Sequence, residues 1–199
     1  MKKLIPCALC LALCACGETR VVDLQNQKDV SSMQNVMELE YRDWTNTAEN
    51  MTKSMIESGA LVKKPVIAIA NIKNDTAQRF DTDILTKKIR STLLKSGKAQ
   101  IATNFSGEDT TSNVVRSQRA NDEYDQKTIA EKGTLVAPNM SLSGKMLQRN
   151  LKLQSGWFSS VDTRVEYYLQ LTLTDLKTGL SVWEDEQPIV KEGDHAPIW

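Results

Sequence analysis

The feature of this chain that most constrains its fold is a run of alternating side chains at residues 161–175, VDTRVEYYLQLTLTD. Apolar residues alternate with polar ones along it, at Val161, Val165, Tyr167, Leu169, Leu171 and Leu173. Because successive side chains of a β-strand point to opposite faces, the run predicts a strand with one buried face and one wet face. DLKTG then predicts a hairpin turn, and LSVWEDE predicts a second strand with Leu180 and Val182 on one face and Trp183 on the other. This pattern is typical of an antiparallel sheet covered on one side, and it excludes a doubly wound parallel sheet.

Two amphipathic helices are predicted in the first half of the chain. In YRDWTNTAENMTKSMIESGA, apolar side chains recur at helical spacing at Trp44, Ala48, Met51, Met55 and Ile56. Asp43 or Thr45 can cap the start of this helix, and Gly59 can end it in a left-handed turn. In DTDILTKKIRSTLLKSGK, a second stripe is formed by Ile84, Leu85, Ile89, Leu93 and Leu94, between Asp81 and Gly97.

The segments between these elements complete the order of helices and strands. KKPVIAIANI predicts a buried strand that begins at Pro65, NDTAQRF a turn and loop, and KAQIATN a short strand. The polar residues 105–125 include a short helix that we expect to pack on the sheet, QKTIAEKG predicts another helix, and TLVAPNMSLSGKML predicts a strand with a bend near Pro138. NLKLQSGWFSS predicts a loop or the end of a hairpin. The order predicts an α/β or α+β sandwich, in which helices pack on a central, mostly antiparallel sheet.

The first twenty residues, MKKLIPCALCLALCACGETR, hold all four cysteines of the chain. Two lysines precede an apolar run at residues 4–13, which has the length of a signal-peptide core and is too short for a stable membrane span. A zinc site is the alternative, but the neighbours of Cys7, Cys10 and Cys14 are apolar rather than turn-forming. The export signal is therefore the favoured interpretation.

The stretch Leu13-Cys14-Ala15-Cys16 resembles the lipobox of bacterial lipoproteins. The resemblance implies cleavage before Cys16, acylation of its thiol and new amino terminus (palmitate among the acyl groups), and firm anchoring in a membrane. We therefore expect a signal peptide at residues 1–15, a lipidated tether at 16–40 and a globular domain at 41–199. Gly17 stands where an aspartate usually means retention in the inner membrane, so we expect the outer membrane, with the domain facing the periplasm.

Composition argues against several functional classes. The chain has 25 basic and 25 acidic residues, so it lacks the basic excess that favours nucleic-acid binding. Its one histidine, His195, lies in the C-terminal stretch GDHAPIW, where we expect a solvated tail, and neither EDE at 184–186 nor SGK at 143–145 matches a metal or phosphate motif. We expect no catalytic residue, no metal and no cofactor. A periplasmic hydrolase with paired carboxylates is an alternative that no motif marks.

Residues 41–188 resemble LpoB-type lipoproteins, the activators of penicillin-binding proteins. The features that carry the resemblance are Asp43-Trp44 at the start of a helix with methionines, the segment 72–76, Ser96-Gly97-Lys98, and the closing hairpin YYLQLTLTDLKTGLSVWEDE. The resemblance implies a fold similar to the N-terminal domain of TolB. It also implies a non-enzymatic, monomeric outer-membrane lipoprotein that binds a bifunctional class A penicillin-binding protein and stimulates peptidoglycan synthesis, with effects on the cell wall and cell shape.

No motif locates the partner-binding surface. We expect the loop residues Asn74, Asp75, Arg79 and Phe80 to form it, with the aromatic pair Trp157 and Phe158 as a second choice. Residues 17–40 lack the long proline-rich tether that members of the family can carry. The alternative function is a subunit of an envelope secretion or assembly complex related to CsgG, although the chain has no obvious membrane-spanning hairpin.

Overall fold

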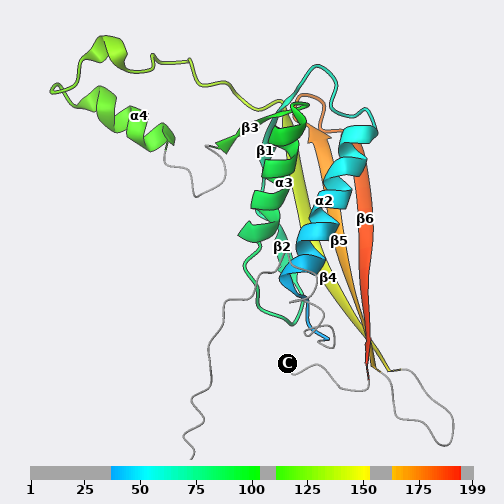
Figure 1. Ribbon diagram of the computed structural model, residues 1–199. Coiled ribbons are helices and arrows are strands. Elements are labelled where there is room, and N and C mark those ends of the chain that lie inside the picture. Colours follow the sequence, from blue (N-terminus) through cyan, green and yellow to red (C-terminus); the bar gives the residue numbers. More distant parts are fainter. Residues whose placement is uncertain (1–36, 104–110, 153–162, 194–199) are drawn as a thin grey trace, which may run out of the picture. The chain divides into compact units, whose positions relative to one another are not determined.

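The computed structural model describes residues 37–103, 111–152 and 163–193. Its elements are, in chain order, α2 (Tyr41–Glu57), β1 (Val66–Ile69), β2 (Lys73–Asp75), α3 (Asp83–Ser96), β3 (Gln100–Ala102), α4 (Thr111–Ala120), the 3₁₀ turn η3 (Gln126–Thr128), β4 (Met140–Lys152), β5 (Thr163–Asp175) and β6 (Ser181–Gly193) (Figure 1). Cys16, Trp157 and Phe158 lie outside the described residues, as does His195.

The strands form one sheet in the order β3-β1-β4-β5-β6, and β2 pairs with β4 beside this path. β1 is parallel to both β3 and β4, and β2 is parallel to β4, in ladders of three residue pairs each. The ladders between β4 and β5 and between β5 and β6 are antiparallel, and these three strands have 13 residues each. Most of the pairing is therefore antiparallel, and the predicted mixed α and β fold is confirmed.

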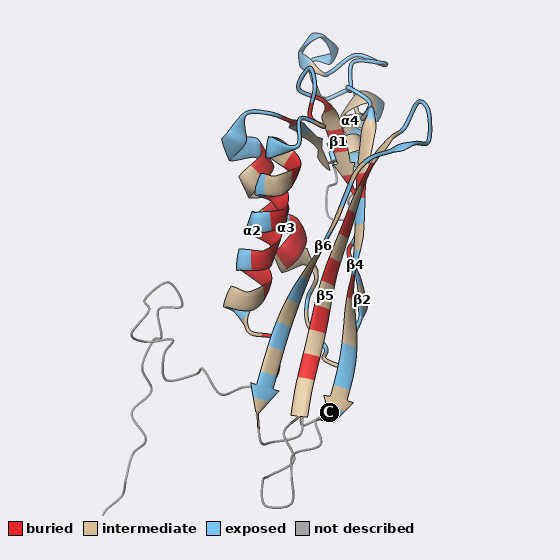
Figure 2. Cartoon of the chain, turned by 90° about the vertical axis from the view of Figure 1, so that its right-hand side faces the viewer, coloured by how far each residue is buried: buried red, intermediate tan, exposed pale blue. Residues whose placement is uncertain are grey.

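The core lies between the sheet and two helices that cover one of its faces (Figure 2). Alternate residues of β5 supply its centre, and each is fully buried: Val165, Tyr167, Leu169, Leu171 and Leu173. α2 packs on them with Met51 and Met55, and α3 with Ile89 and Leu93. Apolar positions at period two in the strand and at period 3.6 in the helices thus meet in one layer. Leu94, which the sequence assigns to the apolar stripe of the second helix, is 52% exposed, so that assignment is wrong.

The helix ends follow their local chemistry. α2 begins with a capping box, in which the Glu40 side chain accepts from the backbone of Asp43 and the Asp43 side chain accepts from the backbone of Glu40. Thr45, the alternative cap, lies within the helix and donates to the carbonyl oxygen of Tyr41 at 2.9 Å. Gly59 and Gly97 follow the two helices with φ of 78° and 66°, in the left-handed region that glycine adopts most readily. The predicted stops are therefore confirmed.

The prediction of a turn and loop at residues 74–80 is partly wrong, because Lys73–Asp75 form strand β2. β1 pairs with residues 140–142 of β4, and β2 pairs with residues 145–147 of the same edge. The chain therefore continues along β4 after a short break. β4 is long enough to present unpaired backbone groups beyond β1, and β2 satisfies them.

Three further expectations differ from the structure. α4 buries none of its residues, and Val114 is 45% exposed, so this helix does not pack on the sheet through its valines. The helix predicted at residues 126–133 is only the turn η3, whose amide at Lys127 donates to the Asp125 side chain. This short polar segment lacks an apolar face to pack, and packing is what stabilises a short helix. β4 begins at Met140, after the predicted bend, and it extends through residues 150–152, which were expected in a loop or at the end of a hairpin.

The packed part of the chain starts before α2. Met37 and Leu39 are 8% and 3% exposed and belong to the core, although the sequence places both in the tether. Both side chains pack into the core ahead of the first turn of α2. Nothing in the polar run around them predicts this contact.

Candidate partner-binding surface

The structure places the four loop residues predicted to bind a partner in β2 and the connection to α3. The Asp75 and Arg79 side chains are exposed there, whereas Asn74 and Phe80 are half-buried. Asn74 shapes the loop: its Nδ2 donates to the carbonyl oxygen of Gln78 at 2.9 Å, and its Oδ1 accepts from the amide of Thr76 at 3.1 Å. The ring of Phe80 packs against Trp44, with centroids 4.5 Å apart. Asn74 and Phe80 therefore hold the loop, and Asp75 and Arg79 are its outward-facing side chains.

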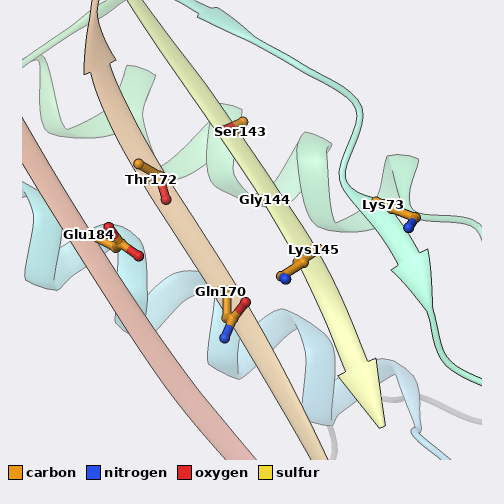
Figure 3. Close-up of a pocket in the computed structure, with 7 residues that line it drawn as sticks. All are labelled: Lys73, Ser143, Gly144, Lys145, Gln170, Thr172 and Glu184. Carbon is orange, nitrogen blue, oxygen red and sulfur yellow. The ribbon is translucent and has the colours of Figure 1, made fainter. Parts of the chain in front are cut away.

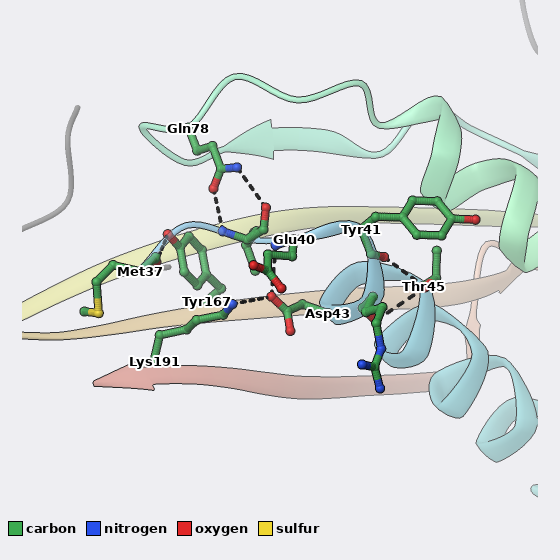
Figure 4. A network of polar contacts seen from close by, with 10 residues as sticks. Met37, Glu40, Tyr41, Asp43, Thr45, Gln78, Tyr167 and Lys191 are labelled. Atoms are coloured by element: carbon green, nitrogen blue, oxygen red, sulfur yellow. Dashed lines mark hydrogen bonds and ion pairs between the residues drawn. The ribbon is translucent and has the colours of Figure 1, made fainter. Parts of the chain in front are cut away.

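The same loop holds the segment that precedes α2 (Figure 4). The Gln78 side chain forms two hydrogen bonds with the backbone of Leu39, accepting from its amide at 2.8 Å and donating to its carbonyl at 3.0 Å. The Tyr167 hydroxyl donates to the carbonyl oxygen of Met37 at 3.1 Å, and Lys191 of β6 forms a 2.6 Å ion pair with Asp43. These contacts fix where the N-terminal segment leaves the domain. The role of Gln78 could not be predicted, because a glutamine in a polar turn carries no signal of a distant backbone partner.

Tyr167 makes stability sensitive to alkaline pH. Burial raises the pKa of its phenol well above the ordinary tyrosine value, and the charges of Glu38 and Asp43 raise it further. A folded-state pKa above the unfolded value of about 10 means that this contribution is complete below about pH 10 and is lost as pH rises further, because the unfolded phenol ionises first.

We therefore expect the free energy of unfolding to fall above about pH 10, by up to about 1.4 kcal/mol per pH unit from this group. Tyr167→Phe should remove that part of the slope. Urea unfolding of both proteins between about pH 8 and pH 11 measures the difference, and Tyr168, present in both, cancels. Equal slopes for the two proteins would contradict the assignment to Tyr167.

The face of the sheet opposite the helices presents mainly polar side chains, and we call it the open face. Its residues on the three long strands are Ser143, Lys145, Leu147 and Arg149 of β4, Glu166, Tyr168, Gln170 and Thr172 of β5, and Glu184, Glu186, Pro188 and Val190 of β6. All are exposed or half-buried. This is the wet face that the alternation at residues 161–175 predicts.

Several acidic groups of the open face are already engaged. The Tyr168 hydroxyl donates to Glu166 at 2.5 Å, and this hydrogen bond raises the pKa of Tyr168. Arg164 forms ion pairs with Glu166 and with Glu192. The amide of Gln170 donates to Glu186. The contacts with Glu192 and Glu186 join β5 to β6, and the two with Glu166 lie within β5.

A shallow hollow of about 380 Å³ lies on the open face where β2 meets β4 (Figure 3). Its lining residues are Lys73, Ser143, Gly144, Lys145, Gln170, Thr172 and Glu184. The lining combines two ammonium groups, two hydroxyls, an amide and one carboxylate. These groups recognise charged or polar atoms by ion pairs and hydrogen bonds. Lys73 is the first residue of β2, so the hollow adjoins the strand that ends at Asp75.

No group of three or more histidine, cysteine, aspartate or glutamate side chains in the described ranges could hold a metal ion. Among the helices of the described residues, none is both long and apolar enough to cross a membrane.

Comparison with known proteins gives one family. The family described as "Peptidoglycan-synthase activator LpoB" matches residues 43–189. Among solved structures, the chain is similar to the LpoB C-terminal domain from Escherichia coli, with 13% identity over 74% of this chain and 98% of that chain and a TM-score of 0.46. The corresponding domain from Salmonella enterica gives 16% identity, the same coverage and a TM-score of 0.46. No curated protein matches.

The family match includes α2 from Asp43 onward, the strands β1 to β5, β6 as far as Ile189, and the whole connection between β1 and α3. It covers well over half of the chain, and both the hollow and the loop lie inside it. This chain therefore belongs to the LpoB family of peptidoglycan-synthase activators.

Proposed function

We propose that this protein is an outer-membrane lipoprotein that faces the periplasm, binds a class A penicillin-binding protein and stimulates its synthesis of peptidoglycan. The observation that carries the proposal is the family match over residues 43–189, since the family is one of activators rather than enzymes. An activator of this kind acts by binding the active state of its partner better than the inactive state. The exposed hollow and the adjoining loop supply a surface for that contact. The CsgG-like alternative is not favoured, because the matching family is a different one.

We further propose that the protein acts as a monomer. β6 is an edge strand, and the amide of Glu186 donates to the Asp185 side chain at 2.9 Å rather than across the ladder. In an antiparallel strand, the N–H and C=O groups of residues i and i+2 point to the same side. Pro188 therefore faces the free edge together with Glu186, and it has no N–H group to donate there. Two successive donors of the edge are thus unavailable. An edge of this kind resists pairing with the edge of a second copy.

Anchoring is proposed from the lipobox, with Cys16 as the acylated residue. We expect anchoring and partner binding to use different parts of the chain, because the LpoB match begins at residue 43. Cys16→Ser should therefore move the protein from the membrane fraction to the soluble fraction of cells, while the purified variant still stimulates a synthase.

The test uses the full-length mature protein, purified in detergent and added to a class A synthase from the same cell with lipid-linked precursor. We expect faster glycan polymerisation and more cross-links than with buffer or with an unrelated lipoprotein at the same detergent concentration. The same preparation should elute as a monomer, whereas a pore subunit would form large rings. If none of the cell's class A synthases responds, the proposed function is refuted.

A further inference from the structure

The hollow on the open face contains two lysines in an arrangement that the sheet alone does not favour. Lys73 of β2 and Lys145 of β4 lie directly opposite each other in the parallel ladder, and both side chains line the hollow (Figure 3). Like charges at directly opposed positions of neighbouring strands destabilise a sheet. Local arrangements that cost stability are expected at functional sites.

Neighbouring acidic groups leave this positive charge largely uncompensated. Lys73 is 3.8 Å from Asp75, but both side chains are more than half exposed, and such a pair contributes little. Among the described residues Lys145 forms no ion pair, and Glu186 is held by Gln170. Glu184 lines the hollow from β6, on the far side of Thr172 of β5. The side of the hollow formed by β2 and β4 is therefore cationic.

The other groups on that side are hydrogen-bond donors of suitable type. Ser143 precedes Lys145 by two residues on β4, so both side chains lie on the same face, and the Thr172 side chain is opposite Ser143 on β5. Two ammonium groups and two hydroxyls around one hollow match the acceptor oxygens of a carboxylate. A volume of about 380 Å³ accommodates one side chain or a short segment.

We propose that this hollow receives a glutamate or aspartate side chain of the partner synthase, with Lys73 and Lys145 as its cationic contacts. The inference rests on the proposed function, and it specifies the partner's chemistry: an acidic segment that lies across β2 and β4. Charge complementarity selects this occupant, because Lys145 forms no ion pair among the described residues and Lys73 has only its exposed pair with Asp75. Asp75, which lies on the same face of β2 as Lys73, then borders the contact.

The test is a titration of the full-length protein, in detergent, against the purified cognate class A synthase. The variants are Lys145→Glu, Lys73→Glu and Lys145→Arg, and Lys53→Glu is the matched control. Lys53 lies on α2, on the covered side of the sheet, where its exposed pair with Glu49 contributes little. Lys145→Glu places opposite charges across the ladder, so the sheet should be at least as stable as before, and loss of binding cannot be attributed to unfolding.

We expect each lysine-to-glutamate variant at the hollow to raise the dissociation constant roughly tenfold or more. Lys145→Arg and Lys53→Glu should bind like the unmodified protein. Binding of the unmodified protein should also weaken with added salt more steeply than binding of Lys145→Glu, because the ion pair is screened. Urea midpoints of all variants check the fold.

The outcomes separate the two proposals. If the unmodified protein binds no class A synthase of the cell, the proposed function fails, and this inference fails with it. If the unmodified protein binds and both lysine-to-glutamate variants bind equally well, the proposed function stands and the carboxylate site is refuted. If the variants lose binding to purified peptidoglycan but keep binding to the synthase, the occupant is a carboxylate of the wall peptide, and the inference about the synthase is overturned.

Discussion

Gly144→Ala is expected to lower the free energy of unfolding by about 2–3 kcal/mol. A Cβ atom at Gly144 would lie 2.5 Å from Cδ2 of Leu171 and 2.6 Å from the backbone oxygen of Gln170. The backbone oxygen belongs to the β4–β5 ladder and has no free rotation, and Leu171 is fully buried. The strands must therefore separate, or the core must repack.

A loss of this size corresponds to a fall in Tm of roughly 5–10 °C for a domain of this length. Urea unfolding followed by circular dichroism measures it. Gly193→Ala is the matched control, because the Cβ there would meet only the side chain of Met37, with its sulfur at 2.9 Å. A flexible methionine can move, so the control should cost clearly less. Equal effects at the two glycines would contradict the close approach of β4 and β5.

Leu171→Ala is expected to cost about 3–4 kcal/mol, because it leaves a cavity in the centre of the core. Leu171 is 0% exposed, and it lies in the middle strand of the antiparallel ladders, under α2 and α3. Leu180→Ala is the control: Leu180 is 65% exposed, and the same substitution there should change stability by no more than about 0.5 kcal/mol. If the two variants unfold at the same urea concentration, the assignment of β5 to the core is wrong.

A double variant with Gly144→Ala and Leu171→Ala tests whether the two residues are in contact. Removing the Leu171 side chain relieves one of the two clashes at Gly144, and the new methyl group partly fills the cavity. The cost of Gly144→Ala with Leu171→Ala should therefore be smaller than the sum of the single costs, by roughly 1 kcal/mol or more. It should not vanish, because the backbone oxygen of Gln170 stays in place. Additive costs would mean that the two residues do not touch.

The open face suggests how activity and stability are divided in this domain. The helix-covered side carries the fully buried aliphatic core, whereas the opposite side carries charge at exposed positions. Substitutions at Lys73 or Lys145 should therefore affect binding with little loss of stability, and substitution of the fully buried Leu171 should do the reverse. The two classes of variant distinguish an activator that fails to fold from one that folds but fails to dock.

Part of the candidate site follows from the sequence and part does not. Asp75 and Arg79 are exposed, as expected of binding residues, because polar residues in a short connection usually stay in water. Phe80 was expected to contact a partner, but it packs on Trp44, and Asn74 holds its own loop. Whether any of these four residues contacts a partner remains a prediction. The hollow could not have been found, because Lys73 and Lys145 come together only through the register of β2 on β4.

The sequence by itself determined the elements whose signals are local. The alternation in β5, the helical stripes of α2 and α3, and the glycines after both helices depend on period and backbone conformation, which neighbouring residues set. Only the tertiary structure decided which face of β6 the helices cover, and therefore that Trp183 packs on the core while Val182 is exposed. It also decided that Lys73–Asp75 extend the sheet and that Met37 and Leu39 join the core. These features arise from contacts between residues far apart in the chain. A local sequence pattern does not identify the distant residues that will pack against it.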